Sequence, residues 1–525
     1  MKRIAIGLGA LALTAVPVAG RPVQVVERPL AELSADLAAG RGSSAALTQA
    51  YLDRIAKLNR RGPMLRAVIA VNPDALAAAR ASDARRRAGR LLGPLDGIPI
   101  LVKDNIETAD RMATTAGSLA LTDNLTGRDA PVIASLRRAG AVILGKTNLS
   151  EWANIRADRS MSGWSGVGGL VRNPYALDRT ACGSSSGSGA AVAASFAAAA
   201  LGTETNGSLV CPGSINGIVA LKPTVGLVSR TRIIPISSTQ DTAGPMARSV
   251  RDAAILFGAM VGADPDDVAT RNAGAYLRDY AAGLSADGLR GKRVAVLRPT
   301  MSPDLTRVFD AAVAQLSAAG AVVVPVTRPS VDIGDSETVV LLTELKVGLN
   351  AYLATTPARV TARTLDQVIA FDSANVAAEM PFFAQEQFEK AAQTKGLADP
   401  AYLAAKAKVV RGGREAIEAM LVAAQADVLV APTTGPAWLS DPVNGDQSSG
   451  PSASGLPAMA GWPHLTVPMG RVDGLPVGLS FIGRAYSEAT LFGAGYAFEQ
   501  QARARVAPTY AEHADAGPGL DGVVR

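Results

Sequence analysis

The apolar positions of residues 43–60 recur at intervals of three and four, as expected for one face of an α-helix. These positions are Leu47, Tyr51, Ile55 and Leu58. Ser43 or Ser44 precedes the apolar face, and serine is a common helix N-cap. The pattern predicts a helix here and a second helix over about 73–90, before the turn-rich stretch GPLDGIP.

Further along the chain, short runs of Val, Ile and Leu alternate with segments of helical character. The expected strands are 100–102, 141–144, 199–204, 294–297, 322–326, 428–430, 465–467 and 477–482. Helices are expected at about 130–139 and 187–199, and residues 329–425 read as a mostly helical lobe. Such alternation favours strands that are buried on both faces. We therefore predict an α/β fold: a single large domain with a central mixed, mostly parallel β-sheet covered by helices on both faces.

The first twenty residues have the pattern of an export signal. Lys2 and Arg3 precede an apolar run from Ile4 to about Val16, which is too short for a permanent membrane span. We predict that 1–20 is a signal peptide, that 21–525 is the mature domain, and that the protein is periplasmic or secreted. An uncleaved anchor is the alternative. No later run of eighteen uncharged apolar residues follows, so no stable membrane association is expected after cleavage.

Composition excludes several classes of partner. The 525 residues are 48% hydrophobic, and no run of five or six basic residues concentrates the net charge of +6, so nucleic-acid binding is not expected. Only two histidines and two cysteines occur, which argues against a catalytic metal, and no cofactor is expected. The expected partner is a small-molecule or peptide substrate, and the expected state is a monomer.

Two motifs invite interpretations that their surroundings contradict. Residues 140–147 match the phosphate-loop pattern, but the four residues between the glycines form an apolar strand instead of a loop. Residues 183–187 match the nucleophile elbow of α/β-hydrolases with Ser185 at the centre. That elbow requires a histidine base. His464 precedes a strand, where a structural role is favoured, and His513 lies in the polar C-terminal tail, so neither histidine suits that role.

A lysine can replace histidine as the base if burial lowers its pKa. Lys103 directly follows the strand 100–102, at a carboxyl end where open α/β sheets place their sites. A glycine- and serine-rich stretch leads into an Ala-rich helix and a strand, and it is followed by Gly207 and Ser208. Gly207 permits a tight turn, in which the amides from Thr205 to Ser208 could hold an oxyanion.

Several ordered segments resemble the amidase signature family. They are GPLDGIPILVKDN at 93–105, GAVILGKTNLSEWAN at 140–154, RNPYALDRTACGSSSGSGAAVAA at 172–194, LGTETNGSLVCPGSINGIVALKPTVGLVS at 201–229 and DTAGPMARSV at 241–250. Agreement is weaker at 460–470, and the resemblance spans about residues 30–500. Within the family, EWAN, CGSSSGSG and the Cys-Pro after Ser208 are most similar to bacterial peptide amidases, which remove the C-terminal amide of peptides.

The resemblance implies a serine amidohydrolase with a Ser-Ser-Lys triad. Ser208 is the implied nucleophile, Ser184 relays its proton to Lys103, and an acyl-enzyme forms on Ser208. The backbone amides of Thr205, Asn206, Gly207 and Ser208 are the implied oxyanion hole. The family also joins the residue matching Ser184 to its preceding glycine by a cis peptide bond.

Other features leave alternatives open. Asn206 stands where family members commonly have Gly or Asp, which makes the preferred amide less certain than the reaction. Asp241 is interpreted as a structural partner for a nearby loop, and Trp152 as a residue that lines the substrate pocket or belongs to the core. Cys182 and Cys211 form either one disulfide or two buried thiols. The alternative functions are hydrolysis of fatty-acyl or aryl-acyl amides, glutamine hydrolysis within a transfer-RNA amidotransferase, and non-catalytic binding.

Overall fold

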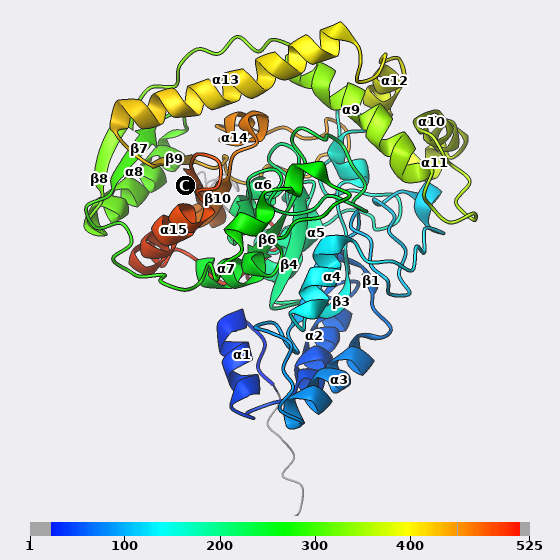
Figure 1. Ribbon diagram of the computed structural model, residues 1–525, viewed down its shortest axis with the longest axis horizontal. Coiled ribbons are helices and arrows are strands. Elements are labelled where there is room, and N and C mark those ends of the chain that lie inside the picture. Colours follow the sequence, from blue (N-terminus) through cyan, green and yellow to red (C-terminus); the bar gives the residue numbers. More distant parts are fainter. Residues whose placement is uncertain (1–22, 449, 515–525) are drawn as a thin grey trace, which may run out of the picture.

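The computed structural model describes residues 23–448 and 450–514, so the expected signal peptide lies outside the described residues. A central sheet with helices around it forms the body of the molecule (Figure 1). The strands are β1 (Val68–Val71), β2 (Pro99–Lys103), β3 (Val142–Thr147), β4 (Ala199–Glu204), β5 (Val219–Lys222), β6 (Thr242–Ala247), β7 (Arg293–Leu297), β8 (Val322–Val326), β9 (Val428–Pro432), β10 (His464–Val472) and β11 (Leu475–Ile482).

Helices precede, separate and follow these strands. The longer ones are α1 (Leu30–Ala38), α2 (Ser44–Leu58), α3 (Ala75–Arg87), α4 (Pro131–Arg138), α5 (Ser186–Ala193), α7 (Val250–Gly258), α8 (Pro303–Ala318), α9 (Ser336–Leu353), α10 (Leu365–Ala374), α13 (Pro400–Ala424) and α15 (Glu488–Ala502). Short helices are α6 (Val210–Ile215), α11 (Val376–Glu379), α12 (Glu386–Ala392) and α14 (Gly455–Ala460). The expected cap of α2 is confirmed, because Ser43 Oγ accepts the Ala46 N–H at 3.1 Å.

The eleven strands form one mixed sheet in the order β1-β3-β2-β4-β6-β5-β10-β11-β9-β7-β8. Every residue of β2 to β6, β9 and β11 is buried, so both faces of the sheet are covered, and the predicted α/β fold class is confirmed.

The expectation that the sheet is mostly parallel is wrong in detail. Parallel pairing occurs only in β3-β2-β4 and in β9-β7-β8, and six of the ten described pairings are antiparallel. A strand buried on both faces has the same apolar composition in either orientation, so the sequence pattern did not distinguish them. β10 and β11 form an antiparallel hairpin whose turn contains Asp473 and Gly474, both at positive φ.

Helices α9 to α12 form a lobe at one side of the sheet, and the long helix α13 crosses over the sheet and contacts α9 (Figure 1). The lobe is attached to the body around Arg156, which is buried. Arg156 Nη1 lies 2.6 Å from Glu151 Oε1 and 3.8 Å from Asp372 Oδ2, and donates to the Glu379 carbonyl at 2.7 Å. The predicted helical character of 329–425 is thus confirmed for most of that segment. Within the described residues, no helix is long and apolar enough to cross a membrane.

Candidate active site

Lys103 ends strand β2, and its ammonium group is fully buried. Nζ lies 2.7 Å from Ser184 Oγ, 2.8 Å from Thr203 Oγ1, 3.1 Å from Ser185 Oγ and 3.3 Å from the Thr203 carbonyl. Burial lowers the pKa of Lys103 to about 7, although the negative charges of Asp241 and Glu204 act to raise it. A lysine with this pKa is largely neutral just above pH 7 and can accept a proton.

Ser184 lies in the glycine- and serine-rich segment that precedes α5. The Gly183–Ser184 peptide bond is cis, as the family resemblance implies. A side chain at position 183 would not fit, because a Cβ atom there would lie 2.1 Å from Ser150 Oγ. The Ser184 hydroxyl of this segment lies 2.7 Å from Lys103 Nζ.

Ser208 follows the turn after β4 and is partly exposed. Gly207 has φ +87°, a conformation that favours glycine. The Ser185 N–H donates to the Ser208 carbonyl at 3.2 Å, which places the two serine-bearing segments side by side. Among the hydrogen bonds of the described residues, none joins the hydroxyls of Ser184 and Ser208.

The turn before Ser208 presents backbone donors. Glu204 Oε2 accepts the amides that follow the turn, Leu209 N–H at 2.7 Å and Val210 N–H at 3.1 Å. In the described part of the chain, the N–H groups of Asn206, Gly207 and Ser208 donate to no protein acceptor. The Thr205 N–H likewise donates to none there, so all four predicted oxyanion donors are free to bind an external oxygen. Thr205, the fourth residue, is held by its side chain and carbonyl, as its Oγ1 donates to Asp241 Oδ1 at 2.6 Å and its carbonyl accepts from Gln240 Nε2 at 3.3 Å.

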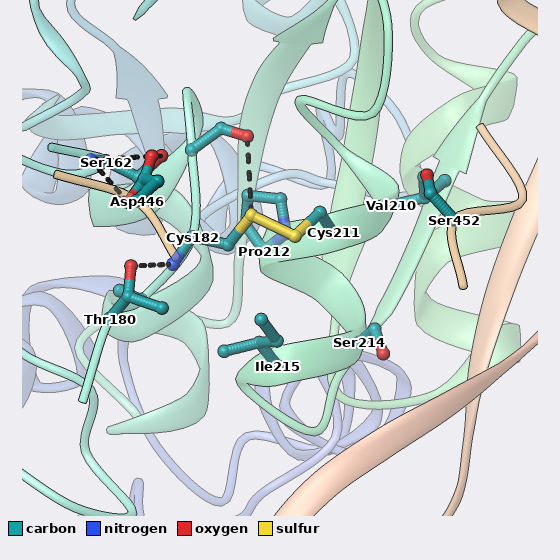
Figure 2. Close-up of a disulfide and its surroundings, with 12 residues drawn as sticks. Ser162, Thr180, Cys182, Val210, Cys211, Pro212, Ser214, Ile215, Asp446 and Ser452 are labelled. Carbon is teal, nitrogen blue, oxygen red and sulfur yellow. Dashed lines mark hydrogen bonds between the residues drawn. A yellow bond between two sulfur atoms is a disulfide. The ribbon is translucent and has the colours of Figure 1, made fainter. Parts of the chain in front are cut away.

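A disulfide joins Cys182 and Cys211, with 6.0 Å between their Cα atoms (Figure 2). Of the two alternatives left open by the sequence, the structure has the bridge. Cys182 lies two residues before Ser184, and Cys211 lies three residues after Ser208 in α6. The bridge therefore connects the segments that carry the two serines.

Other polar residues near the turn have structural partners. Asp241 Oδ2 accepts the amides of Ile236 at 2.8 Å and Ser237 at 2.9 Å, in agreement with the predicted role as a partner for a loop. Burial raises the pKa of Asp241. A small cavity of about 30 Å³, lined by Asn105, Thr203 and Thr205 among others, lies against the end of β4.

Trp152 lies in the hydrophobic core. Its side chain is 3% exposed and packs edge to face on Phe388 of α12, with ring centroids 5.8 Å apart. Trp152 belongs to a hydrophobic cluster that includes Leu345 and Leu349 of α9. The structure thus favours the core alternative over the pocket alternative.

The residues of the phosphate-loop pattern, and the histidine that a nucleophile elbow would require, are structural. Gly145 and Lys146 lie inside strand β3, and Lys146 Nζ donates to the Ile106 carbonyl at 2.6 Å, so residues 140–147 form no phosphate loop. His464 Nε2 lies 2.6 Å from Ser480 Oγ in the buried sheet, and burial lowers the pKa of His464 to about 3. A neutral histidine held in this way is a structural residue.

The sequence did not reveal that Thr203 and Ser185 are hydrogen-bond partners of Lys103. Thr203 Oγ1 lies beside Lys103 Nζ and also accepts from Asn105 Nδ2 at 3.0 Å. Ser185, considered only as an elbow nucleophile, lies 3.1 Å from Lys103 and donates to the Thr203 carbonyl at 2.9 Å. Both residues come close to Lys103 because β2 pairs in parallel with β4, which places Val102 beside Leu201. This strand pairing could not be recognised from the sequence alone.

Comparisons with known proteins identify the family that the chain resembles. The Amidase family model matches residues 46–492. A probable amidase of Arabidopsis thaliana is 38% identical over 480 residues, covering 89% of this chain and 88% of that protein. A glutamyl-tRNA(Gln) amidotransferase component of Thermosynechococcus vestitus is 35% identical, covering 89% of this chain and 97% of that protein.

Solved structures match over nearly the whole described chain. Native peptide amidase from Stenotrophomonas maltophilia has a TM-score of 0.89 at 51% identity, covering 92% of this chain and 99% of that one. An amidase family protein from Bacillus anthracis has a TM-score of 0.84 at 35% identity, covering 92% and 93%. The sequence motifs, the Lys103–Ser184 arrangement and these matches lead to one conclusion: the chain belongs to the amidase family.

Proposed function

We propose that this protein is a serine amidohydrolase that removes ammonia from C-terminal peptide amides through an acyl-enzyme on Ser208. The observation that carries the proposal is the buried Lys103 amine, with a pKa of about 7 and the Ser184 hydroxyl 2.7 Å away. A neutral amine in hydrogen-bond contact with a serine is the base that a histidine-free hydrolase needs.

In the proposed reaction, Lys103 accepts the Ser184 proton while Ser184 accepts the Ser208 proton. Ser208 Oγ forms a bond to the amide carbon, and the carbonyl electrons move to oxygen, where the free N–H groups of Asn206, Gly207 and Ser208 stabilise them. The C–N bond then breaks as the proton returns through Ser184 to the nitrogen, and ammonia leaves. Water attacks the resulting ester by the same proton path, which releases the carboxylic acid and restores Ser208.

The peptide substrate is supported by relatives. Two of the solved structures at 51–52% identity are described as peptide amidases, one of them in complex with the competitive inhibitor chymostatin. Hydrolysis of fatty-acyl or aryl-acyl amides is the alternative. We also propose that the protein is exported and works as a monomer. The pattern of residues 1–20 supports export, and so does the Cys182–Cys211 bridge, because disulfides persist mainly in oxidising compartments.

The test is ammonia or amine release by the mature chain from a blocked dipeptide amide, an aryl anilide, a long-chain fatty amide and free glutamine. The proposal expects the dipeptide amide to be the best substrate and Ser208→Ala to abolish its hydrolysis. Preference for the anilide or the fatty amide would favour the alternative substrate class. A folded protein that hydrolyses none of the four would contradict the enzymatic function.

A further inference from the structure

Glu337, in the first turn of α9, is hydrogen-bonded to the turn that carries the proposed nucleophile. Asn206 Nδ2 donates to Glu337 Oε1 at 2.8 Å, and Gln240 Nε2 donates to the same oxygen at 2.9 Å. Asn206 is exposed and lies two residues before Ser208, so their Cα atoms are at most about 7 Å apart. Glu337 therefore places a carboxylate at the edge of the reactive turn.

The position of this carboxylate is fixed from two directions. Asn206 Oδ1 accepts the Ser454 hydroxyl at 2.7 Å, which orients its amide toward Glu337. On the other side, Glu344 lies two helical turns further along α9 and is buried. Glu344 accepts the Ser237 hydroxyl at 2.5 Å and the Thr239 N–H at 2.9 Å, which anchors the helix to the loop before β6.

Glu337 differs from the other acidic residues around the turn. Glu204 and Asp241 each accept two backbone amides, and burial raises the pKa of Asp241. Glu337 is only partly buried, its Oε2 accepts no hydrogen bond, and it forms no ion pair with any lysine or arginine of the described chain. The N-terminus of α9 also favours a negative charge at this position.

We propose that Glu337 is a specificity-determining residue that favours amide substrates with a positive charge close to the scissile amide. The inference rests on the proposed function, and it names the substrate class that the same site prefers. An uncompensated carboxylate attracts a lysine- or arginine-containing peptide amide and repels an acidic one. It also supplies, from the helical lobe, the negative charge that Asn206 cannot provide.

The test compares kcat/KM for three blocked peptide amides of similar length: acetyl-Ala-Lys-amide, acetyl-Ala-norleucine-amide and acetyl-Ala-Glu-amide. A second set, with alanine and the variable residue in the opposite order, moves the charge one residue away from the scissile amide. Glu337→Gln keeps an acceptor oxygen for Asn206 and Gln240 but removes the charge. We expect this variant to lower the Lys-to-norleucine ratio about three- to tenfold and to raise the Glu-to-norleucine ratio. That is the effect expected for unit charges about 6–10 Å apart at a partly hydrated site.

Glu415→Gln on the exposed side of α13 is the matched control, because it changes the net charge equally and makes no contact with the turn. It should leave both ratios unchanged. If Glu337→Gln does not fold, the wild-type Lys-to-norleucine ratio is measured at low and high salt, and it should fall as salt screens the carboxylate. Ratios that are unchanged in Glu337→Gln, or independent of salt, would overturn the inference. Absence of hydrolysis of all three amides by the wild-type protein would instead contradict the proposed function.

Discussion

At the scale of single residues, the site depends on an amine held without a charged hydrogen-bond partner. Every hydrogen-bond partner of Lys103 Nζ among the described residues is a hydroxyl or a carbonyl, and Asp241 and Glu204 act on it only through space. A carboxylate in direct contact would keep the lysine protonated and unable to serve as a base. Neutral partners therefore fix the position of the Lys103 amine without raising its pKa.

The pKa of Lys103 predicts the pH dependence of activity. Its pKa of about 7 means that the fraction of neutral amine falls about tenfold for each pH unit below that value. We expect kcat/KM to rise between pH 5 and 7 and to level off above. A steady-state pH profile measures this, and a flat profile over that range would rule out Lys103 as the base.

Removal of the amine is a second prediction. Lys103→Met fills a similar volume without a basic group, and we expect kcat to fall by a factor of at least about 10³, since the relay loses its base. The measurement is ammonia release from a peptide amide, with circular dichroism to confirm that the variant is folded. A loss of less than tenfold would show that another group accepts the proton.

Ser184 and Ser185 provide a matched pair for a third prediction. Both hydroxyls contact Lys103 Nζ, but Ser185 Oγ already donates to the Thr203 carbonyl. Ser184→Ala should therefore lower kcat by about 10²–10⁴-fold, and Ser185→Ala by much less. Equal losses from the two variants would contradict the assignment of the relay to Ser184.

At the scale of elements, two short segments must keep a fixed position relative to each other. They are the segment before α5 and the turn between β4 and α6. The Ser185–Ser208 backbone hydrogen bond and the Cys182–Cys211 bridge both connect them. The bridge spans 29 residues of chain, and the chain-entropy model gives a stabilisation of about 3–4 kcal/mol for a loop of this size.

Replacement of both cysteines by alanine should lower the melting temperature and also kcat. The first effect follows from the entropy of the unfolded chain, and the second from looser placement of Ser184 relative to Ser208. Calorimetry and peptide amide kinetics measure the two effects separately. An unchanged kcat at a lower melting temperature would limit the bridge to a stabilising role.

The sequence predicted many elements well, but not their pairing. Helix α2 and its Ser43 cap, and strands β2 to β4, β7 to β9 and β11, agree closely with the expected ranges, because hydrophobic periodicity is a local property; β10 is several residues longer than expected. β6 was missed because its sequence, TAGPMA, contains Gly and Pro, which are uncommon in strands. Thr203 was missed because its contact with Lys103 depends on which strands are neighbours.

At the scale of the whole molecule, we expect the attachment of the helical lobe to weaken as pH rises. The carboxylate of Asp372 in α10 accepts no hydrogen bond from the described residues. Its burial, and secondly the charge of Glu379, raises the pKa of Asp372 to about 7. The folded pKa is above the unfolded value of 3.8, so the contribution of Asp372 to stability is full below about pH 4 and is lost as pH rises through about 7.

We therefore expect the melting temperature to fall between pH 5 and 8, and the fall to be smaller in Asp372→Asn. The variant should be more stable than the wild type at pH 8, by about 1–3 kcal/mol, because no buried acid has to ionise. Asp366→Asn, at an exposed position of the same helix, is the control and should keep the wild-type slope. Parallel slopes in all three proteins would contradict this assignment.

The anchoring of α9 has an evolutionary consequence. Glu344 ties the helix to the Ser237–Thr239 loop, while Glu337, seven residues earlier, faces Asn206. The residue at position 337 can therefore mutate while the helix stays in place and the residues of the proposed triad keep their own contacts. If position 337 sets specificity as proposed, such a protein acquires a new substrate preference by single substitutions in its lobe, and natural selection acts on specificity without first lowering the rate of the reaction.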